Sequence, residues 1–302
     1  MAADSARWDG FTFRHGDIVV STPPKCGTTW TQTICCLLVS GGTELDRPLA
    51  EVSPWLDMQT NVLADIYALF EAQTHRRVIK THTPLDGLPV DERATYVCVG
   101  RDPRDVALSW EHHMANMNLE NFLSARMTNV GLDDLADMPV PVPPPEDPIE
   151  RFWAWVDGEP DMSNIMTLGS IFHHYETFWD VRDQPGFGLF HYADLLADLP
   201  GEITRLAGVV GIDITEERAQ ELAQATSFDR MKAQADRLIP DNGNAIFLDN
   251  AAFFHNGGGG QWRDLLDDAG LERYQRRVAE LAPPDIVEWA HIGSLGVSPS
   301  AR

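Results

Sequence analysis

The chain has 302 residues, of which 43% are hydrophobic and 9% aromatic, and this composition indicates a folded globular protein rather than a disordered one. Its 46 acidic residues outnumber 23 basic ones and give a net charge of −23, which disfavours general binding to nucleic acids or to anionic membrane surfaces. No apolar run approaches the roughly 20 residues that are needed to cross a bilayer.

Four short apolar runs bounded by turn residues predict buried strands of a parallel sheet. They are Asp17–Ser21, Arg77–His82, Thr95–Gly100 and Leu189–Tyr192. Helices are predicted after three of them, at Thr28–Ser40, Asp105–Met117 and Gly201–Val210, the first of which should end at Gly41-Gly42. Strands that alternate with helices indicate an α/β fold, and we expect residues 1–302 to form one domain.

Two segments depart from this alternation. Residues 131–148 hold acidic residues followed by a proline-rich stretch, which predicts either a surface insertion or a lid beside an active site. Residues 257–260 are four consecutive glycines, which indicate either a flexible turn or a place where the backbone approaches a ligand closely.

The cysteines and the N-terminus both bear on the compartment. Cysteines 26, 35, 36 and 98 form no CxxC pattern, so we expect free thiols in a reducing environment, without a disulfide framework or a zinc site. The first ten residues lack the basic-then-apolar pattern of a signal peptide. We therefore expect a cytoplasmic protein.

The loop between the first strand and the first helix has the features of an anion site. A helix N-terminus offers unpaired amides and partial positive charge, to which Lys25 adds a full charge and Gly27 adds close access. Thr28 and Thr29 can add hydroxyl donors. The pattern is not a Walker A loop, because the lysine precedes the glycine, and read alone it could also be a structural loop.

The next two strand ends carry polar residues as well. The second strand ends in Lys80-Thr81-His82, and the third is followed by Arg101 and, one helical segment later, Ser109. Ligands of open α/β sheets bind outside the carboxyl ends of the strands. We therefore expect these side chains to meet the phosphate loop at one edge of the sheet.

These motifs, in this order, resemble those of the cytosolic-type sulfotransferases, which transfer a sulfuryl group from 3′-phosphoadenosine-5′-phosphosulfate (PAPS) to a hydroxyl group. The matching strings are PKCGTTW, KTHTP, RDPRDVALSW, HYAD and a glycine-rich segment before Gln261-Trp262. Longer strings, including VSPWLDMQ and LAPPDIVEWAH, look most like mycobacterial sulfotransferases of the glycolipid type. The resemblance extends over roughly residues 7–295. It implies a P-loop-kinase-like three-layer fold, with a central parallel sheet flanked by helices.

The resemblance implies catalytic roles for three residues. Lys25 corresponds to the lysine that neutralises the bridging oxygen as the 5′-phosphate leaves, and Lys80 to a lysine that supports the transferring group. His82 corresponds to the general base that takes the acceptor's hydroxyl proton. Lys80 and Lys25 should lower the pKa of His82 and so favour its neutral form near pH 7.

The resemblance also implies a binding set for PAPS. Trp30 and Phe228 would stack on the adenine, with Tyr192 near its edge, and Arg101 and Ser109 would grip the 3′-phosphate. The full set is Lys25, Cys26, Gly27, Thr28, Thr29, Trp30, Arg101, Ser109, Tyr192, Phe228, His255, Asn256 and Gly257. For Arg101 the alternative is a surface ion pair with Asp102 or Asp105.

The chain departs from the family pattern at two places. His255-Asn256-Gly257 stands where the family usually has Arg-Lys-Gly, so two permanent charges for the 3′-phosphate are absent, and Arg263 is a candidate for compensation. Cys26 replaces a common serine or alanine. Beside Lys25 and a helix N-terminus, the pKa of Cys26 should fall and make the thiol an oxidation site.

The acceptor is expected to be small and lipophilic: a hydrophobic alcohol, a phenol or a glycolipid. The family comparison suggests Trp55, Trp110 and Met114, with residues 114–126, as lining for its pocket. No metal constellation is evident in the sequence, and the family's C-terminal dimer motif is absent, so the oligomeric state stays open. The alternatives are a degenerate family member that binds a nucleotide or lipid without turnover and, less favoured, a nucleotide kinase.

Overall fold

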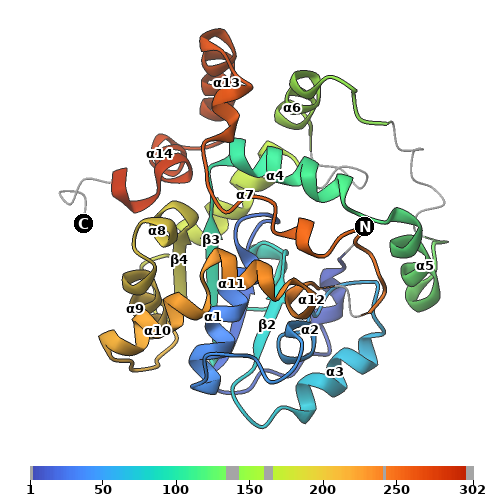
Figure 1. Ribbon diagram of the computed structural model, residues 1–302, viewed down its shortest axis with the longest axis vertical. Coiled ribbons are helices and arrows are strands. Elements are labelled where there is room, and N and C mark those ends of the chain that lie inside the picture. The colour runs from blue at the N-terminus through green and yellow to red at the C-terminus, as the bar shows by residue number, and fades with distance from the viewer. Residues whose placement is uncertain (1–2, 134–142, 160–165, 241–242, 297–302) are drawn as a thin grey trace.

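The computed structural model describes residues 3–133, 143–159, 166–240 and 243–296. Its centre is a parallel four-stranded sheet in the order β2-β1-β3-β4 (Figure 1). The strands are β1 (Asp17–Ser21), β2 (Val78–Thr81), β3 (Ala94–Gly100) and β4 (Phe187–His191). All four predicted strands are confirmed, with bounds within two residues of those expected. One detail was wrong: Tyr192 begins a helix instead of ending the fourth strand, because the His191 side chain caps that helix by accepting from the Ala193 amide.

Fourteen α-helices connect and surround the strands in the part of the chain that the structure describes. They are α1 (Thr28–Ser40), α2 (Leu49–Val52), α3 (Leu63–Ala72), α4 (Pro103–Ala115), α5 (Leu119–Val130), α6 (Pro148–Val156), α7 (Leu168–Trp179), α8 (Tyr192–Ala197), α9 (Leu199–Val209), α10 (Glu216–Ala225), α11 (Phe228–Ala233), α12 (Ala235–Leu238), α13 (Asp268–Leu281) and α14 (Pro284–Ile292). The three predicted helices correspond to α1, α4 and α9.

The ends of α1 and α4 follow from local chemistry. Gly41 ends α1 in the left-handed conformation, with φ of 69°, and its amide donates to the Leu37 carbonyl. Helix α4 starts two residues earlier than predicted. Pro103 occupies its first turn, where no amide donor is needed, and the Asp102 side chain caps it by accepting from the Arg104 amide.

Alternate strand residues build the cores on the two faces of the sheet. In β1, Ile18 and Val20 pack with helices α1, α9 and α10 on one face. Val19 packs on the other face, where α3 and α7 contribute Phe70 and Phe178. Helices thus cover both faces of the sheet, which is the three-layer arrangement expected for a buried parallel sheet (Figure 1).

The connections leave the carboxyl edge of the sheet open to a cavity. Residues 134–142 of the proline-rich segment lie outside the described residues, so neither the insertion nor the lid interpretation is tested. The flanking residues include Gly131 after α5 and Pro148 at the start of α6.

Among the described helices, none is both long and apolar enough to span a membrane.

Candidate active site

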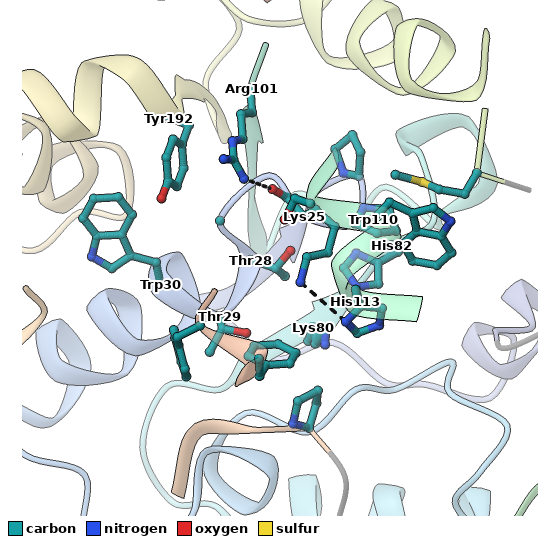
Figure 2. Close-up of a pocket in the computed structure, with 18 of the residues that line it drawn as sticks. Lys25, Thr28, Thr29, Trp30, Lys80, His82, Arg101, Trp110, His113 and Tyr192 are labelled. Carbon is teal, nitrogen blue, oxygen red and sulfur yellow. Dashed lines mark hydrogen bonds between the residues drawn. The ribbon is translucent and has the colours of Figure 1, made fainter. Parts of the chain in front are cut away.

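A cavity of about 660 Å³ lies at the carboxyl edge of the sheet. Residues that follow β1, β2 and β3 all line it, as expected for a ligand site in an α/β sheet. Lys25, Lys80, His82 and Arg101 converge on it (Figure 2). The predicted convergence of three strand ends is therefore confirmed.

The loop after β1 presents the N-terminus of α1 to this cavity. Lys25 adopts a left-handed backbone conformation, with φ of 68°, and Gly27 follows with φ of 96°. A side chain at Gly27 would also crowd the Tyr192 ring, whose nearest atom lies 3.1 Å from the position of a Cβ. Within the described part of the chain no side chain caps the α1 N-terminus, so its first amides and the Thr29 hydroxyl can serve an anion, while the Thr28 hydroxyl also pairs with that of Thr22.

Two lysines face the cavity without an ion-pair partner among the described residues. The ammonium group of Lys25 lies 3.5 Å from Nδ1 of His113 and 4.7 Å from the centre of the Phe253 ring. That of Lys80 lies 4.0 Å from the centre of the Trp55 ring. Burial, and then Arg101, lowers the pKa of Lys25 to about 8. Burial, and then Lys25, lowers the pKa of Lys80 to about 7. In a chain of net charge −23, one buried and one half-buried cation with lowered pKa values indicate a site for an anion.

His82 is held in the tautomer that a general base requires. Its Nδ1 atom lies 2.7 Å from the carbonyl oxygen of Thr22, which can only accept, so Nδ1 carries the proton and Nε2 keeps its lone pair. Burial first, and Lys80 second, lower the pKa of His82 well below its ordinary value. The predicted direction is confirmed, but burial is the main cause and Lys25 is not among the contributors.

Arg101 is buried and its guanidinium organises the phosphate loop. It donates to the carbonyl oxygens of Lys25 and Gly258, at 3.0 Å each, and lies 4.5 Å from the centre of the Tyr192 ring. Its Nε atom is buried without a partner among the described residues. The alternative of a surface ion pair is wrong, because Asp102 pairs with Arg104, while Asp105 accepts from the amides of Gly260 and Gln261. Ser109, in the second turn of α4, lines the cavity as well.

An aromatic cluster forms the end of the cavity beyond Arg101. Trp30 contacts Tyr192 edge to face at 5.5 Å, and the Tyr192 hydroxyl donates to the Gly257 carbonyl at 2.9 Å. Phe228 packs so closely on Gly257 that a Cβ there would lie 2.5 Å from the ring. The absence of a side chain at Gly257 thus serves contact with a protein ring, so the expected close approach of the glycine run to a ligand stays a prediction. The indole nitrogen of Trp30 is buried without a partner among the described residues.

His255 and Asn256 both line the cavity, but they form a different structure from two free cations. His255 stacks on His112, with ring centres 3.8 Å apart and planes at 29°. The Asn256 side chain accepts from the Gly258 amide at 2.9 Å. Arg263 lies over the Trp262 ring, exposed and outside the cavity lining, so the structure does not support it as the compensating cation.

Two predicted site residues, Cys26 and Met114, are not brought to the cavity, and neither is the rest of the predicted lining stretch 114–126. The buried Sγ atom of Cys26 lies 3.4 Å from the hydroxyl of Tyr175, and burial raises its pKa to about 12; the expected lowering was wrong because the side chain points into the core. Met114 is 43% exposed and does not line the cavity. On α4 the side chain of Met114 projects about 140° from that of Ser109 at 100° per residue, whereas His113 projects only about 40° away.

Near His82 the cavity is lined by aromatic and apolar side chains, including the predicted Trp55 and Trp110. Sequence reasoning missed several others, namely Met58, His112, His113, Phe247 and Phe253. It also missed Asp57, whose buried carboxylate accepts hydrogen bonds from Trp8, Trp55, Thr81 and Thr83 and so fixes Trp55 beside the end of β2. The spacing of His112 and His113 after Ser109 on one helix was a usable signal for those two. Nothing local marks the others.

Comparison with known proteins connects this geometry to one family. Residues 15–283 match the family model described as a sulfotransferase domain. The chain is 42% identical to a glycolipid sulfotransferase of Mycobacterium bovis (strain BCG / Pasteur 1173P2) over 99% of this chain and 95% of that protein. It is 41% identical to a glycolipid sulfotransferase of Mycobacterium tuberculosis (strain ATCC 25177 / H37Ra), again over 99% and 95%. Among solved structures, retinol dehydratase in complex with androsterone and the inactive cofactor PAP superposes with a TM-score of 0.69 at 23% identity, covering 93% of this chain and 87% of the other.

Proposed function

Because this chain belongs to the sulfotransferase domain family, we propose that it transfers a sulfuryl group from PAPS to a hydroxyl group of a glycolipid. The observation that carries the proposal is that His82, Lys25 and Lys80 line one cavity and that the Nδ1 bond of His82 to Thr22 leaves its Nε2 atom with a lone pair. Relatives named as glycolipid sulfotransferases support the acceptor class.

The described residues fit an adenosine 3′,5′-bisphosphate group. The uncapped N-terminus of α1 and Lys25 suit a 5′-phosphate, while Arg101 and Ser109 suit a 3′-phosphate. Trp30, Tyr192 and Phe228 suit the adenine ring. The orphaned Nε atoms of Trp30 and Arg101 are buried donors that a ligand could satisfy. When bound, PAPS supplies the sulfuryl group as an activated mixed anhydride of phosphate and sulfate.

The catalytic residues would act by positioning and by charge. His82 accepts the proton of the acceptor hydroxyl at Nε2, while its Nδ1–H stays bonded to Thr22. Lys25 stabilises the negative charge that develops on the departing phosphate oxygen, and Lys80 stabilises the oxygens of the group in transit. The negative charge of a bound anion favours the charged form of both lysines, so they hold their protons more tightly once the donor is bound.

A second candidate is a family member that binds the nucleotide but does not turn over. His255 and Asn256 favour it, because they leave the 3′-phosphate without two permanent cations. The intact arrangement of Lys25, Lys80 and His82 favours the enzyme.

Calorimetric titration tests the nucleotide binding that both candidates share. Adenosine 3′,5′-bisphosphate should bind at micromolar Kd or tighter and clearly outcompete 5′-AMP. Transfer of radioactive sulfate from labelled PAPS to octyl β-D-galactoside, a simple glycolipid analogue, then tests catalysis. Bisphosphate binding without transfer to any alkyl glycoside would favour the non-catalytic binder. Equal affinity for the two nucleotides would contradict the PAPS proposal.

A further inference from the structure

His113 is a polar residue in the acceptor region that the proposed mechanism leaves without a role. It lies on α4, half-buried, and lines the cavity with His82, Lys25 and Lys80 (Figure 2). Its ring stacks on Trp110 at 5.4 Å and meets the edges of Phe247 and Phe253 at 5.4 and 5.9 Å. These aromatic walls fix the imidazole in place, as a specific contact to a ligand requires.

The hydrogen bond to Lys25 determines which nitrogen of His113 carries the proton. The ammonium group of Lys25 can only donate, so Nδ1 of His113 accepts and its proton sits on Nε2. Burial, followed by Lys25 and Lys80, lowers the pKa of His113 well below its ordinary value, so the ring has one proton near pH 7. Among the described residues, Nε2 of His113 has no hydrogen-bond partner. The cavity wall therefore offers an N–H donor at this point.

His82 and His113 thus have opposite tautomers in the same cavity. His82 is bonded through Nδ1–H to Thr22 and offers a lone pair at Nε2, whereas His113 is bonded through its Nδ1 lone pair to Lys25 and offers a proton at Nε2. A single hydroxyl group that is to be sulfated needs only the lone pair of His82, to which it gives its proton. Two hydroxyl groups on adjacent carbons match both, because one can donate to His82 while the other accepts from His113.

We propose that His113 is an acceptor-binding residue that selects a vicinal diol, by donating from Nε2 to the hydroxyl next to the one that is sulfated. The inference rests on the proposed function and narrows its acceptor from any lipophilic hydroxyl compound to a sugar that has adjacent free hydroxyls. Trp110 and Trp55, which flank the two histidines at 5.4 and 4.7 Å, offer apolar ring surface to the C–H groups of such a sugar. Lys25 has three donors, so it can keep its bond to His113 while it also binds an anion.

The experiment combines changes in the acceptor with changes at His113. The hydroxyl of octyl β-D-galactoside that becomes sulfated is first identified by NMR of the product. Values of kcat/KM are then measured for the parent glycoside and for the analogues that lack one neighbouring hydroxyl. The proteins are the wild type, His113→Phe, His113→Asn and His113→Gln, with His173→Phe as a control. His173 lies at the cavity and pairs with Asp86 at 2.9 Å, so it is a histidine of the same cavity with its own partner.

For the wild type, loss of the correct neighbouring hydroxyl should lower kcat/KM about tenfold, the size of one hydrogen bond to a neutral donor. His113→Phe should process the parent and that deoxy analogue equally well, and so should His113→Asn, whose amide reaches only the position of Nδ1. His113→Gln places an amide donor near the position of Nε2 and should restore part of the preference. His173→Phe should keep the full preference. Affinity for adenosine 3′,5′-bisphosphate should not change in His113→Phe.

Three results would overturn the inference while leaving the proposed function intact. They are sulfation at a primary hydroxyl that has no vicinal neighbour, a wild type that tolerates every deoxy analogue, and a His113→Phe variant that keeps the tenfold preference. If the wild type binds the bisphosphate but sulfates no alkyl glycoside, the proposed function fails and the inference fails with it.

Discussion

The Nδ1 atom of His82 lies 2.7 Å from the carbonyl oxygen of Thr22, the residue that follows β1. The residue that follows β1, the neighbour of β2 in the sheet, thus supplies the hydrogen-bond acceptor that orients the proposed base. The bond can form because β1 and β2 are adjacent and in register, with Ser21 opposite Thr81, so Thr22 and His82 leave the sheet side by side. An imidazole that is locked at one nitrogen and free at the other meets the geometric requirement for proton transfer.

The variant His82→Asn tests this base directly. The asparagine amide can still donate to the Thr22 carbonyl but has no basic nitrogen, so the backbone contact remains while proton transfer is lost. We expect turnover to fall by about 10²- to 10⁴-fold, the usual contribution of general base catalysis. The affinity for adenosine 3′,5′-bisphosphate, measured by calorimetry, should differ from that of the wild type by no more than about twofold to threefold. This is the effect expected of a neutral substitution outside the nucleotide contacts. Near-normal turnover in this variant would remove His82 from the mechanism.

The pH dependence of kcat/KM should reflect both lysines on its alkaline side. The profile reports the free enzyme, in which the pKa is lowered to about 8 for Lys25 and to about 7 for Lys80, and both must be charged in the proposed mechanism. The value of kcat/KM should therefore begin to decline above about pH 7, as Lys80 loses its proton, and decline more steeply above about pH 8, as Lys25 does. No acid-side loss from His82 should occur near pH 6.5, because its pKa lies well below that and the base is already neutral.

The variant Lys25→Arg identifies the group behind the alkaline decline. An arginine stays charged throughout the accessible pH range, so the steeper part of the decline, above about pH 8, should disappear, even though the lower fit of the guanidinium reduces the rate. The part that belongs to Lys80, which begins near pH 7, should remain. Rates measured from pH 5.5 to 10 for the two proteins give the comparison. An unchanged steep decline above pH 8 in Lys25→Arg would show that Lys25 does not cause it.

The α1 helix and its glycine stop could be predicted because they depend on residues adjacent in the chain. Apolar spacing marks the body of the helix, and Gly41 supplies the left-handed residue that ends it. The convergence of Lys25, Lys80 and Arg101 was predictable for a different reason: parallel strands deliver their carboxyl ends to one edge of a sheet.

The errors and omissions concern properties that only tertiary packing determines. Cys26 has a helix N-terminus and a lysine beside it in sequence, yet its side chain enters the core against Tyr175, and desolvation outweighs the nearby charges. Phe253 reaches the cavity from a short 3₁₀ helix (Ala251–Phe253) more than 200 residues after Lys25, and no local pattern indicates that contact. Asp57 is similar, since its four donors come from three separate segments.

The variant Lys80→Met should stabilise the ligand-free protein although it removes activity. Burial lowers the pKa of Lys80 to about 7, so the unfolded state binds its proton more tightly than the folded state. The charged group therefore destabilises the fold, fully so below pH 7, and this cost shrinks as pH rises toward the unfolded value near 10.4. Methionine has a similar shape without the charge, and we expect a gain of about 1–3 kcal/mol in unfolding free energy at pH 6.5, within the range for mutations that remove a poorly compensated buried charge.

Urea unfolding of both proteins at pH 6.5 and pH 9 measures this effect. The difference between Lys80→Met and wild type should be smaller at pH 9. A variant that is less stable than wild type at pH 6.5 would show that Lys80 is compensated in the fold and is not an unpaired charge held for a ligand.

The variant His255→Arg tests whether the 3′-phosphate site is weakened in this chain. His255 is exposed, stacks on His112 at the cavity, and has no permanent charge. An arginine at this position adds a charged donor that can still stack on the imidazole of His112, and one charged hydrogen bond contributes about 1.5–3 kcal/mol. We expect the Kd for adenosine 3′,5′-bisphosphate at pH 8 to fall by about tenfold or more. The Kd for 5′-AMP, which lacks the 3′-phosphate, should change little. Equal gains for both nucleotides would indicate a general effect of charge and would move the 3′-phosphate away from His255.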